Sequence, residues 1–495
     1  PAQAEIGVEV LAEEDPAEAR ALMVARMEQD RYRPFELREP NLVRVRLYRL
    51  PEGGDRITLT FPHILMDGRS FPQVTRDLVL ELLRPGATAS FPPVPSFRDF
   101  VHWLHGREEE QLESDRAFWC GYLAGSEVEA PPRATARGAS GERREVERVL
   151  DHGGTARLRD LAMASGVGIG AVVQAAWGLL LARTEGTDDL LFGVVRTGRP
   201  AVAGGEAIPG AGEDGVGVFI NALPFRFRTD GVARLGDLLR EVGRSNRSIR
   251  PHEYAPLVQI QKWSGRAGGE PLFETLHIHD HGHLDDQLRQ ALQAVVGMGV
   301  DGGGGEEGTP SVCAELVERT PYPITLYSYD GEGLRLRLAH DTGALPEVEA
   351  DDLADRLLAL LEAMQAGPET PLLHLDALLP AEREAVLERW NDTARSFDLD
   401  TTLHARVFER LREDTGRIAV SMATDGLSAG ELDRLSARLA GHLAGLGVGP
   451  GDLVGVALPR STDQVVTLLA VLRLGAAYLP LDPSYPEERL SFMVE

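Results

Sequence analysis

Two segments that favour neither helix nor strand divide this chain, and they constrain its fold more than any single motif does. Residues 130–145 are rich in Pro, Gly, Ala and Arg, and residues 367–402 have a mixed composition that also suits a linker. At 495 residues the chain is too long for one ordinary domain, so we predict two or three domains.

The part before the first segment alternates helical and extended patterns. Apolar residues among charges predict an amphipathic helix over 16–31. Period-two alternation predicts strands over 41–50 and 56–61, and the Gly- and Pro-containing turn between them predicts a hairpin. Two further helical stretches follow at 70–83 and 97–124.

The part between the two segments has an α/β pattern. Its helix at 169–183 is nearly all apolar, so we expect it to be buried. The predicted strands are 190–195, 218–227, 273–279, 323–329 and 334–340, and the other predicted helices are 155–165, 234–249 and 349–365.

The pattern changes again after residue 402. Helices are predicted at 403–413 and 428–446, followed by a strand at 453–458, a helix at 461–474 and a second strand at 477–481. This β-α-β order with short connections indicates the start of a doubly wound parallel sheet.

Charge and cysteine content exclude several classes of function. The formal net charge of -26 argues against nucleic acid or an anionic membrane as a partner. Cys120 and Cys313 lie far apart and have no metal-ligand spacing, so a reducing cytoplasm is the simplest setting. No apolar run reaches membrane-spanning length. The chain begins at Pro1 and stops within an apparent helix, so we expect a fragment of a longer polypeptide.

A histidine at a strand exit is the first candidate site. Pro62 has no N–H for a sheet ladder, so the strand at 56–61 should end there and place His63 at its exit. Asp67 follows four residues later and can fix the loop, and Gly68 permits a turn that other residues resist. A histidine so placed can be catalytic, or the two side chains can simply satisfy loop hydrogen bonds.

Four alternating histidines form a second candidate. His277, His279, His281 and His283 would share one face of a continuous strand and could bind a metal, although Asp280 and Gly282 suggest that the strand ends near there. We therefore expect no functional metal site, and adventitious Zn²⁺ or Ni²⁺ binding is the stronger alternative.

Five segments, in the same order as in a known family, give the first candidate more weight. Residues 63–68 resemble the His-His-x-x-x-Asp-Gly signature of condensation domains in nonribosomal peptide synthetases. The other similar segments are 97–103, 217–224, 252–257 and 271–273. The resemblance covers residues 1 to about 375 and implies two chloramphenicol-acetyltransferase-like α/β lobes arranged in a V.

The end of the chain resembles a second family independently. Residues 390–393 look like the linker into an adenylation domain, and 427–432 and 472–482 resemble its first two motifs. The two resemblances imply an incomplete N-lobe at 1–128, a C-lobe at 129–375, a linker at 376–402 and an adenylation-domain fragment at 403–495. The phosphate loop and later segments of that family are absent from this sequence, so we expect no adenylation by it.

The resemblance implies peptide-bond formation between two thioesters carried on the phosphopantetheine arms of carrier domains. His63 would take the proton of the attacking amine, or stabilise its charge and position it. Asp67 would be architectural, and Gly68 would let the backbone turn near the substrate path. Asn221 could bond substrate or pin the lobe contact, or cap backbone at a strand end. The domain itself would bind no cofactor, and its partners would be an upstream and a downstream carrier domain and the adenylation domain in cis.

Two departures from the family pattern affect these expectations. Pro62 stands here in place of the first histidine of the signature. We expect this change to affect the local backbone geometry more than the chemistry of the site. Roughly the first 80 to 90 residues of the domain are missing by comparison with the family layout, including an Arg that pairs with the motif Asp. We therefore expect Asp67 to lack its partner and the N-lobe framework to be incomplete.

Four rival functions remain open. An epimerisation domain shares the signature but would not lead into an adenylation domain, and a heterocyclisation domain would have Asp in place of His63. A coenzyme A-dependent acyltransferase of related fold would have no adenylation tail. A non-catalytic recruitment domain is favoured by Pro62 and disfavoured by His63.

Overall fold

The computed structural model places the chain in two compact units, Pro1–Ala385 and Val386–Glu495. The described residues are 5–11, 15–51, 55–83, 85–91, 93–107, 109–125, 141–199, 202–203, 206–210, 212, 215–265, 271–281, 318–397, 400–422 and 425–495.

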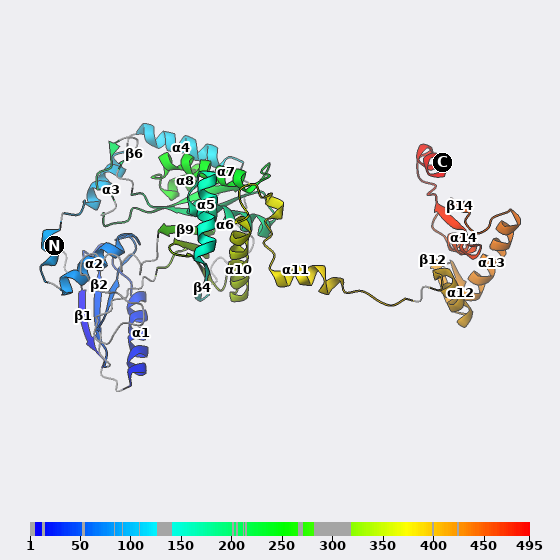
Figure 1. Ribbon diagram of the computed structural model, residues 1–495, viewed down its shortest axis with the longest axis horizontal. Coiled ribbons are helices and arrows are strands. Elements are labelled where there is room, and N and C mark those ends of the chain that lie inside the picture. Colours follow the sequence, from blue (N-terminus) through cyan, green and yellow to red (C-terminus); the bar gives the residue numbers. More distant parts are fainter. Residues whose placement is uncertain are drawn as a thin grey trace. The chain divides into compact units, whose positions relative to one another are not determined.

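The first unit begins with a three-stranded sheet in the order β1-β2-β3 (Figure 1). The elements that build it are β1 (Glu5–Val10), α1 (Pro16–Tyr32), β2 (Arg44–Arg49) and β3 (Asp55–Thr60). Asp15 caps α1 by accepting from the Ala17 N–H, and Pro16 follows at the first helical position, where no N–H is needed. β2 and β3 pair antiparallel, which confirms the predicted hairpin, whereas β1 was not predicted and pairs parallel to β2.

Three helices follow this sheet and lead to the larger one. They are α2 (Phe71–Leu83), α3 (Phe97–His105) and α4 (Glu109–Leu123), with the short turn η1 (Ala87–Ser90) after α2. The single helical stretch predicted at 97–124 is thus two helices, because Gly106 ends α3 by bonding the carbonyls of His102 and Trp103. The aromatic side chains of α3 pack on Phe219 and Tyr254, which belong to the larger part of the unit.

A six-stranded sheet in the order β4-β11-β10-β9-β5-β8 forms the centre of the unit. Its strands are β4 (Arg143–Leu150), β5 (Asp189–Arg196), β8 (Asn221–Arg228), β9 (Thr275–His281), β10 (Ile324–Asp330) and β11 (Leu334–Asp341). The two short strands β6 (Val202–Ala203) and β7 (Glu206–Ala207) pair separately. The helices of this part are α5 (His152–Ser165), α6 (Ile169–Glu185), α7 (Leu235–Ile249), α8 (Leu257–Trp263) and α10 (Glu347–Met364), with turns η3 (Arg250–His252) and η4 (Leu372–His374).

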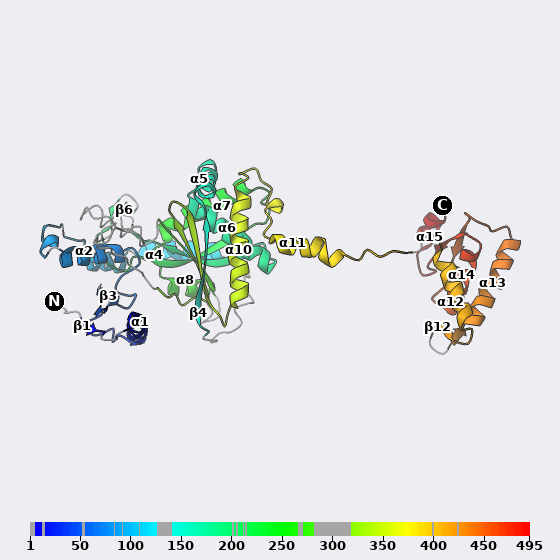
Figure 2. The same cartoon turned by 60° about the horizontal axis from the view of Figure 1, so that its bottom comes forward.

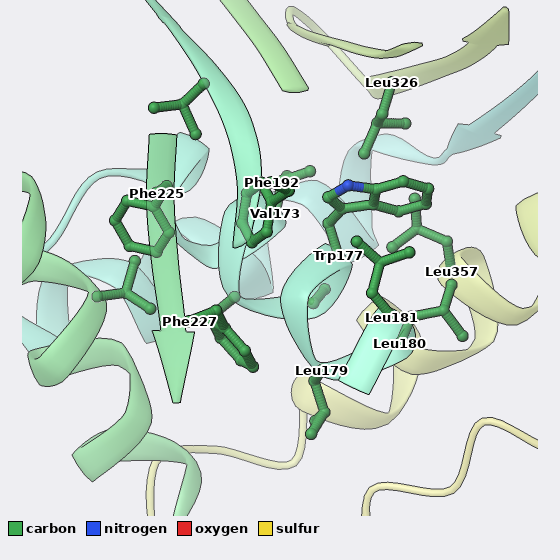
Figure 3. Packing of buried hydrophobic residues seen from close by; sticks show 14 of the residues in the cluster. Val173, Trp177, Leu179, Leu180, Leu181, Phe192, Phe225, Phe227, Leu326 and Leu357 are labelled. Atoms are coloured by element: carbon green, nitrogen blue, oxygen red, sulfur yellow. The ribbon is translucent and has the colours of Figure 1, made fainter. Parts of the chain in front are cut away.

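The main hydrophobic core lies between this sheet and a layer of helices. Helix α6 packs on β5, β9 and β10, and it also contacts α5, α7 and α10 (Figures 1 and 2). Trp177 of α6 is fully buried, and Phe192 of β5 packs beside Phe225 of β8 (Figure 3). The prediction of a buried helix over 169–183 is therefore confirmed.

The second unit starts within the helix α11 (Pro380–Leu387) and the turn η5 (Arg389–Asn391). Its other elements are α12 (Leu403–Glu413), β12 (Ile418–Met422), β13 (Asp425–Ser428), α13 (Ala429–Gly445), β14 (Leu453–Val456), α14 (Thr462–Arg473), β15 (Ala477–Pro480) and α15 (Glu487–Val494). β14 and β15 pair parallel with α14 between them, so the predicted β-α-β unit is confirmed.

Among the described residues no single helix combines the length and apolar composition needed to cross a membrane. Helices α5 and α6 together meet that test by length and composition, but they are bent by 95°.

Candidate functional site

The loop between β3 and α2 carries the candidate histidine. β3 ends at Thr60, two residues before Pro62, as the missing N–H of proline predicts. The Leu65 N–H then donates to the Pro62 carbonyl oxygen at 2.9 Å and closes a turn around His63. This turn brings the loop from the small sheet toward the large part of the unit.

Asp67 is the buried anchor of this loop, with its residue only 2% exposed. Its Oδ1 accepts from the Ser70 N–H at 3.0 Å and from the Ser70 hydroxyl at 2.9 Å. Its Oδ2 accepts from the Phe219 N–H at 3.1 Å, and its own N–H donates to the Gly217 carbonyl at 3.0 Å. The carboxylate therefore joins the loop to the segment that leads into β8.

Arg199 neutralises Asp67, and this corrects the expectation that Asp67 has no partner. Its Nη2 donates to Asp67 Oδ1 at 2.5 Å and to the Ser70 hydroxyl at 2.8 Å. Its Nη1 donates to the Gly215 carbonyl at 2.7 Å, and the guanidinium lies 4.4 Å above the ring of Phe219. The partner comes from the chain after β5, so the pair does not need an arginine from an earlier segment.

Gly198 explains how the chain can deliver Arg199 to this place. Its φ is +55°, a region that side chains disfavour, and an added Cβ would lie 2.0 Å from the Phe219 carbonyl oxygen. By contrast, Gly68 lies in the turn before α2 and is not among the glycines with positive φ. Gly68 therefore does not adopt a left-handed conformation, which is the one that would require a glycine at this turn.

His63 lies at the edge of this buried cluster, and its side chain is 42% exposed. Its Nε2 contacts the Oε1 of Glu318, which lies shortly before β10 and is itself 21% exposed. The Glu318 carboxylate raises the pKa of His63 above its ordinary value, while burial opposes this shift. Nearby, Arg69 Nη2 donates to Asp280 Oδ1 of β9 at 3.2 Å and makes another link between the loop and the large sheet.

None of the contacts described for Asn221 involves His63. Its Nδ2 donates to the carbonyl oxygens of Glu253 and Ala255, both at 2.9 Å. The first residue of β8 thus holds the loop between η3 and α8. Of the alternatives considered for Asn221, these contacts match backbone capping at a strand end.

His279 of β9 lies against helix α6, and His277 shares its hydrogen-bond partner. His277 Nε2 and His279 Nδ1 each lie 2.9 Å from the same Ser328 hydroxyl, and an added Cβ at Gly170 of α6 would collide with His279. Burial lowers the pKa of His277 to about 3. β9 ends at His281, and His283 is outside the described residues. No group of three or more His, Cys, Asp or Glu is placed to hold a metal within the described part of the chain.

Sequence reasoning missed three residues of the site, two of which reach the loop from far along the chain. Arg199, Ser70 and Glu318 all contact His63 or Asp67, and the separations reach 132 residues for Arg199 and 255 for Glu318. Arginine is abundant throughout this sequence, so Arg199 carries no composition signal. Ser70 lies three residues after Asp67, and its local hydrogen bonding is the one feature that spacing could have indicated.

Comparison with known protein families divides the chain as the contacts do. Residues 2–387 match the condensation domain, and residues 407–495 match the AMP-binding enzyme family. One protein of the linear gramicidin synthase of Brevibacillus parabrevis is 32% identical over 486 residues, which cover 97% of this chain. Bacitracin synthase 3 of Bacillus licheniformis is 30% identical over 485 residues, again 97% of this chain. The chain spans only 9% and 7% of the lengths of these two relatives.

Solved structures agree on the fold. The nonribosomal peptide synthetase FmoA3 superposes with a TM-score of 0.70 at 22% identity, and the match covers 99% of this chain and 49% of that one. The condensation domain from the monacolin K polyketide synthase MokA has a TM-score of 0.58 at 18% identity, over 75% of this chain and 81% of that one. The expected α/β class, with an adenylation-type start after the larger unit, is confirmed.

Proposed function

Because this chain belongs to the condensation-domain family of nonribosomal peptide synthetases and continues into the start of an AMP-binding domain, we propose that it forms amide bonds between two carrier-bound thioesters. Within it we assign residues 1–128 and 129–375 to the two lobes, 376–402 to the linker and 403–495 to the adenylation-domain fragment.

One observation supports this proposal most. His63 is half-exposed on a loop whose base is locked by the buried Asp67–Arg199 pair. A ring with one accessible edge on an immobile support can meet a substrate in a single orientation, which is what proton transfer at a reacting centre requires. Asp67 and Gly68 belong to the support, and Asn221 supports the neighbouring loop.

The reaction needs one proton to move from nitrogen to sulfur. The amine of the acceptor attacks the carbonyl carbon of the donor, a C–N bond forms, and the C–S bond breaks to release a thiolate. His63 in its neutral form takes the proton from the nitrogen, and the thiolate is protonated in turn. A free α-amine has a pKa of about 7.7 to 8.0, so part of it is already a neutral nucleophile near neutral pH.

The substrates would arrive on the phosphopantetheine arms of two carrier domains, one for the donor and one for the acceptor. In this proposal the chain binds no cofactor of its own, and an adenylation domain in cis would supply the activated amino acid. A reducing cytoplasm suits the reaction, because the carrier thiols must stay unoxidised to accept and release acyl groups.

The test combines this 495-residue chain with donor- and acceptor-loaded carrier domains and detects the joined product on the acceptor carrier by intact-protein mass spectrometry. We expect His63→Ala to lower the rate by about 100-fold or more, the range of general acid–base catalysis. His152→Ala is the matched control, since His152 is exposed at the start of α5, and it should leave the rate unchanged.

Two results would count against the proposal. One is an unchanged product yield with His63→Ala, which excludes the assigned role of the ring. The other is the absence of product from the wild-type chain across a panel of donor and acceptor pairs. An acyl group that returns with inverted stereochemistry, and no new bond, would instead identify epimerisation.

A further inference from the structure

Glu318 approaches His63 from the opposite side of the site. It precedes β10 of the six-stranded sheet, whereas His63 follows β3 of the three-stranded sheet. The contact joins Oε1 of the carboxylate to Nε2 of the ring, and both side chains are partly shielded, at 21% and 42% exposure. The contact thus joins two residues that are 255 positions apart in the sequence.

Among the described residues, several other charged or ionisable groups near this contact are paired or neutral. Asp67 of the same loop is neutralised by Arg199. On β10, burial raises the pKa of Tyr327, and burial raises the pKa of Tyr329 to about 12, so both hydroxyls are neutral near pH 7. Arg337 of β11 donates to the Tyr329 hydroxyl at 2.8 Å.

A second ion pair links this loop to the large sheet, but it does not involve His63 or Glu318. Arg69 and Asp280 pair with each other at 3.2 Å, which leaves Glu318 as the carboxylate that faces Nε2 among the described residues. One ring nitrogen of His63 is therefore held by a specific acidic side chain.

We propose that Glu318 is a positioning residue of this site, which orients the imidazole of His63 through Nε2 and sets its protonation equilibrium. The inference rests on the proposed function only for its effect on rate. A half-exposed histidine without this contact could occupy several rotamers, and a carboxylate in contact with Nε2 selects one of them. The same contact stabilises the cationic ring relative to the neutral one.

The contact with Glu318 orients His63 but also weakens it as a general base. The more Glu318 favours the cation, the smaller is the fraction of His63 that can accept a proton at a given pH. Removing the carboxylate should therefore disturb the orientation of the ring and, separately, extend the neutral form to lower pH. A residue with a merely structural role would produce the first effect without the second.

The first experiment needs no substrate. Deuterium exchange at the C2 carbon of each histidine is followed by peptide mass spectrometry as a function of pH in the full chain, with Glu318→Gln compared with wild type. We expect the midpoint for His63 to move to lower pH in Glu318→Gln, while His152 in the same digest is unchanged. The matched control is Glu332→Gln, an exposed glutamate in the turn after β10. An unmoved His63 midpoint in Glu318→Gln overturns the inference.

The second experiment measures the proposed reaction. Glu318→Gln should lower kcat by about 10-fold to 100-fold through misorientation of the ring, with a smaller change in KM. The acid limb of its pH–rate profile should move to lower pH, and Glu318→Asp should restore part of the rate. Equal rates and equal acid limbs in all three proteins overturn the inference.

The two proposals fail in different ways. His63→Ala with full activity would refute the proposed function, but it would leave the exchange result for His63 in Glu318→Gln untouched. An unmoved exchange midpoint would refute the role of Glu318 even if His63 is essential. Thermal unfolding of Glu318→Gln should match wild type, and Glu318→Ala, which also lacks the carboxylate, provides the same exchange readout if Glu318→Gln is unstable.

Discussion

The two sheets of the first unit differ in how their faces are covered. The six-stranded sheet has a continuous apolar core with helices α5, α6, α7 and α10, and β5 is buried along most of its length. In the three-stranded sheet, Ile6, Val8 and Val10 of β1 are 71%, 58% and 68% exposed. The buried cluster on its helix side is small and is centred on Leu11, Ala19 and Tyr48.

This difference shows where the rigidity of the candidate site originates. His63 leaves the smaller sheet, whose own core is thin, yet its loop is fixed by Asp67, Arg199 and the backbone before β8. Buried hydrogen bonds and the buried Asp67–Arg199 ion pair thus hold the base of the site loop, while apolar packing holds the large sheet. The comparison can be tested by removing each kind of contact in turn.

The largest loss of stability is expected in the core of the large sheet. Phe192→Ala removes a fully buried ring that packs beside Phe225, at a cost of about 3–5 kcal/mol in the free energy of unfolding. Urea unfolding followed by tryptophan fluorescence measures this change. Phe397→Ala is the matched control, because that ring is 76% exposed, and a similar loss in both variants would contradict the importance of the core.

A loss of about 3 kcal/mol is expected from Asp67→Asn, since Arg199 would remain buried with its charge uncompensated. The double variant Asp67→Asn with Arg199→Met should recover part of that loss, because no unpaired charge remains. The same urea titration applies to both variants.

An exposed ion pair serves as the control for the buried Asp67–Arg199 pair. Asp230→Asn breaks the pair with Arg228, whose side chains are 55% and 52% exposed, and should change stability by no more than about 1 kcal/mol. If Asp67→Asn behaves like Asp230→Asn, the site loop is not held by its buried pair.

The smallest effect is expected on the open face of the small sheet. Val8→Thr keeps the β-branched shape of an exposed side chain and should change the free energy of unfolding by no more than about 0.5 kcal/mol. A loss several times larger, measured by the same titration, would mean that this face is covered in solution and that the two sheets are more alike than their exposure indicates.

Local sequence patterns are sufficient for most elements and for the position of His63. Five strands of the large sheet are predictable because their apolar runs are flanked by turns, and Pro62 identifies the end of β3. β4 (Arg143–Leu150) is not, because most of its residues are charged and its start falls within the segment 130–145, whose composition suits a linker. β1 escapes prediction because it carries Gly7 among alternating residues, and glycine weakens a strand pattern. β8 begins at Asn221, three residues later than the predicted 218, because Phe219 bonds Asp67 and not a neighbouring strand.

Contacts between residues far apart in the sequence cannot be predicted from local sequence patterns. Nothing in the residues around Arg199 or Glu318 indicates which distant side chain each one meets, since such contacts depend on how the two sheets pack. The same reason explains the wrong expectation for Asp67, for which a missing segment implied a missing partner. The physical requirement is a buried cation near the carboxylate, and another part of the chain supplies it.

The contact between His63 and Glu318 also has a consequence for biosynthesis. The two residues are separated by 255 positions, so at about 5–20 residues per second a ribosome needs about 13–50 seconds to add the second after the first. During that interval the small sheet can already have left the ribosome, but its histidine has no carboxylate to meet. The contact can therefore form only after β4, β5, β8 and β9 of the large sheet have been made, and a nascent chain that stalls earlier carries the histidine without the acid that orients it.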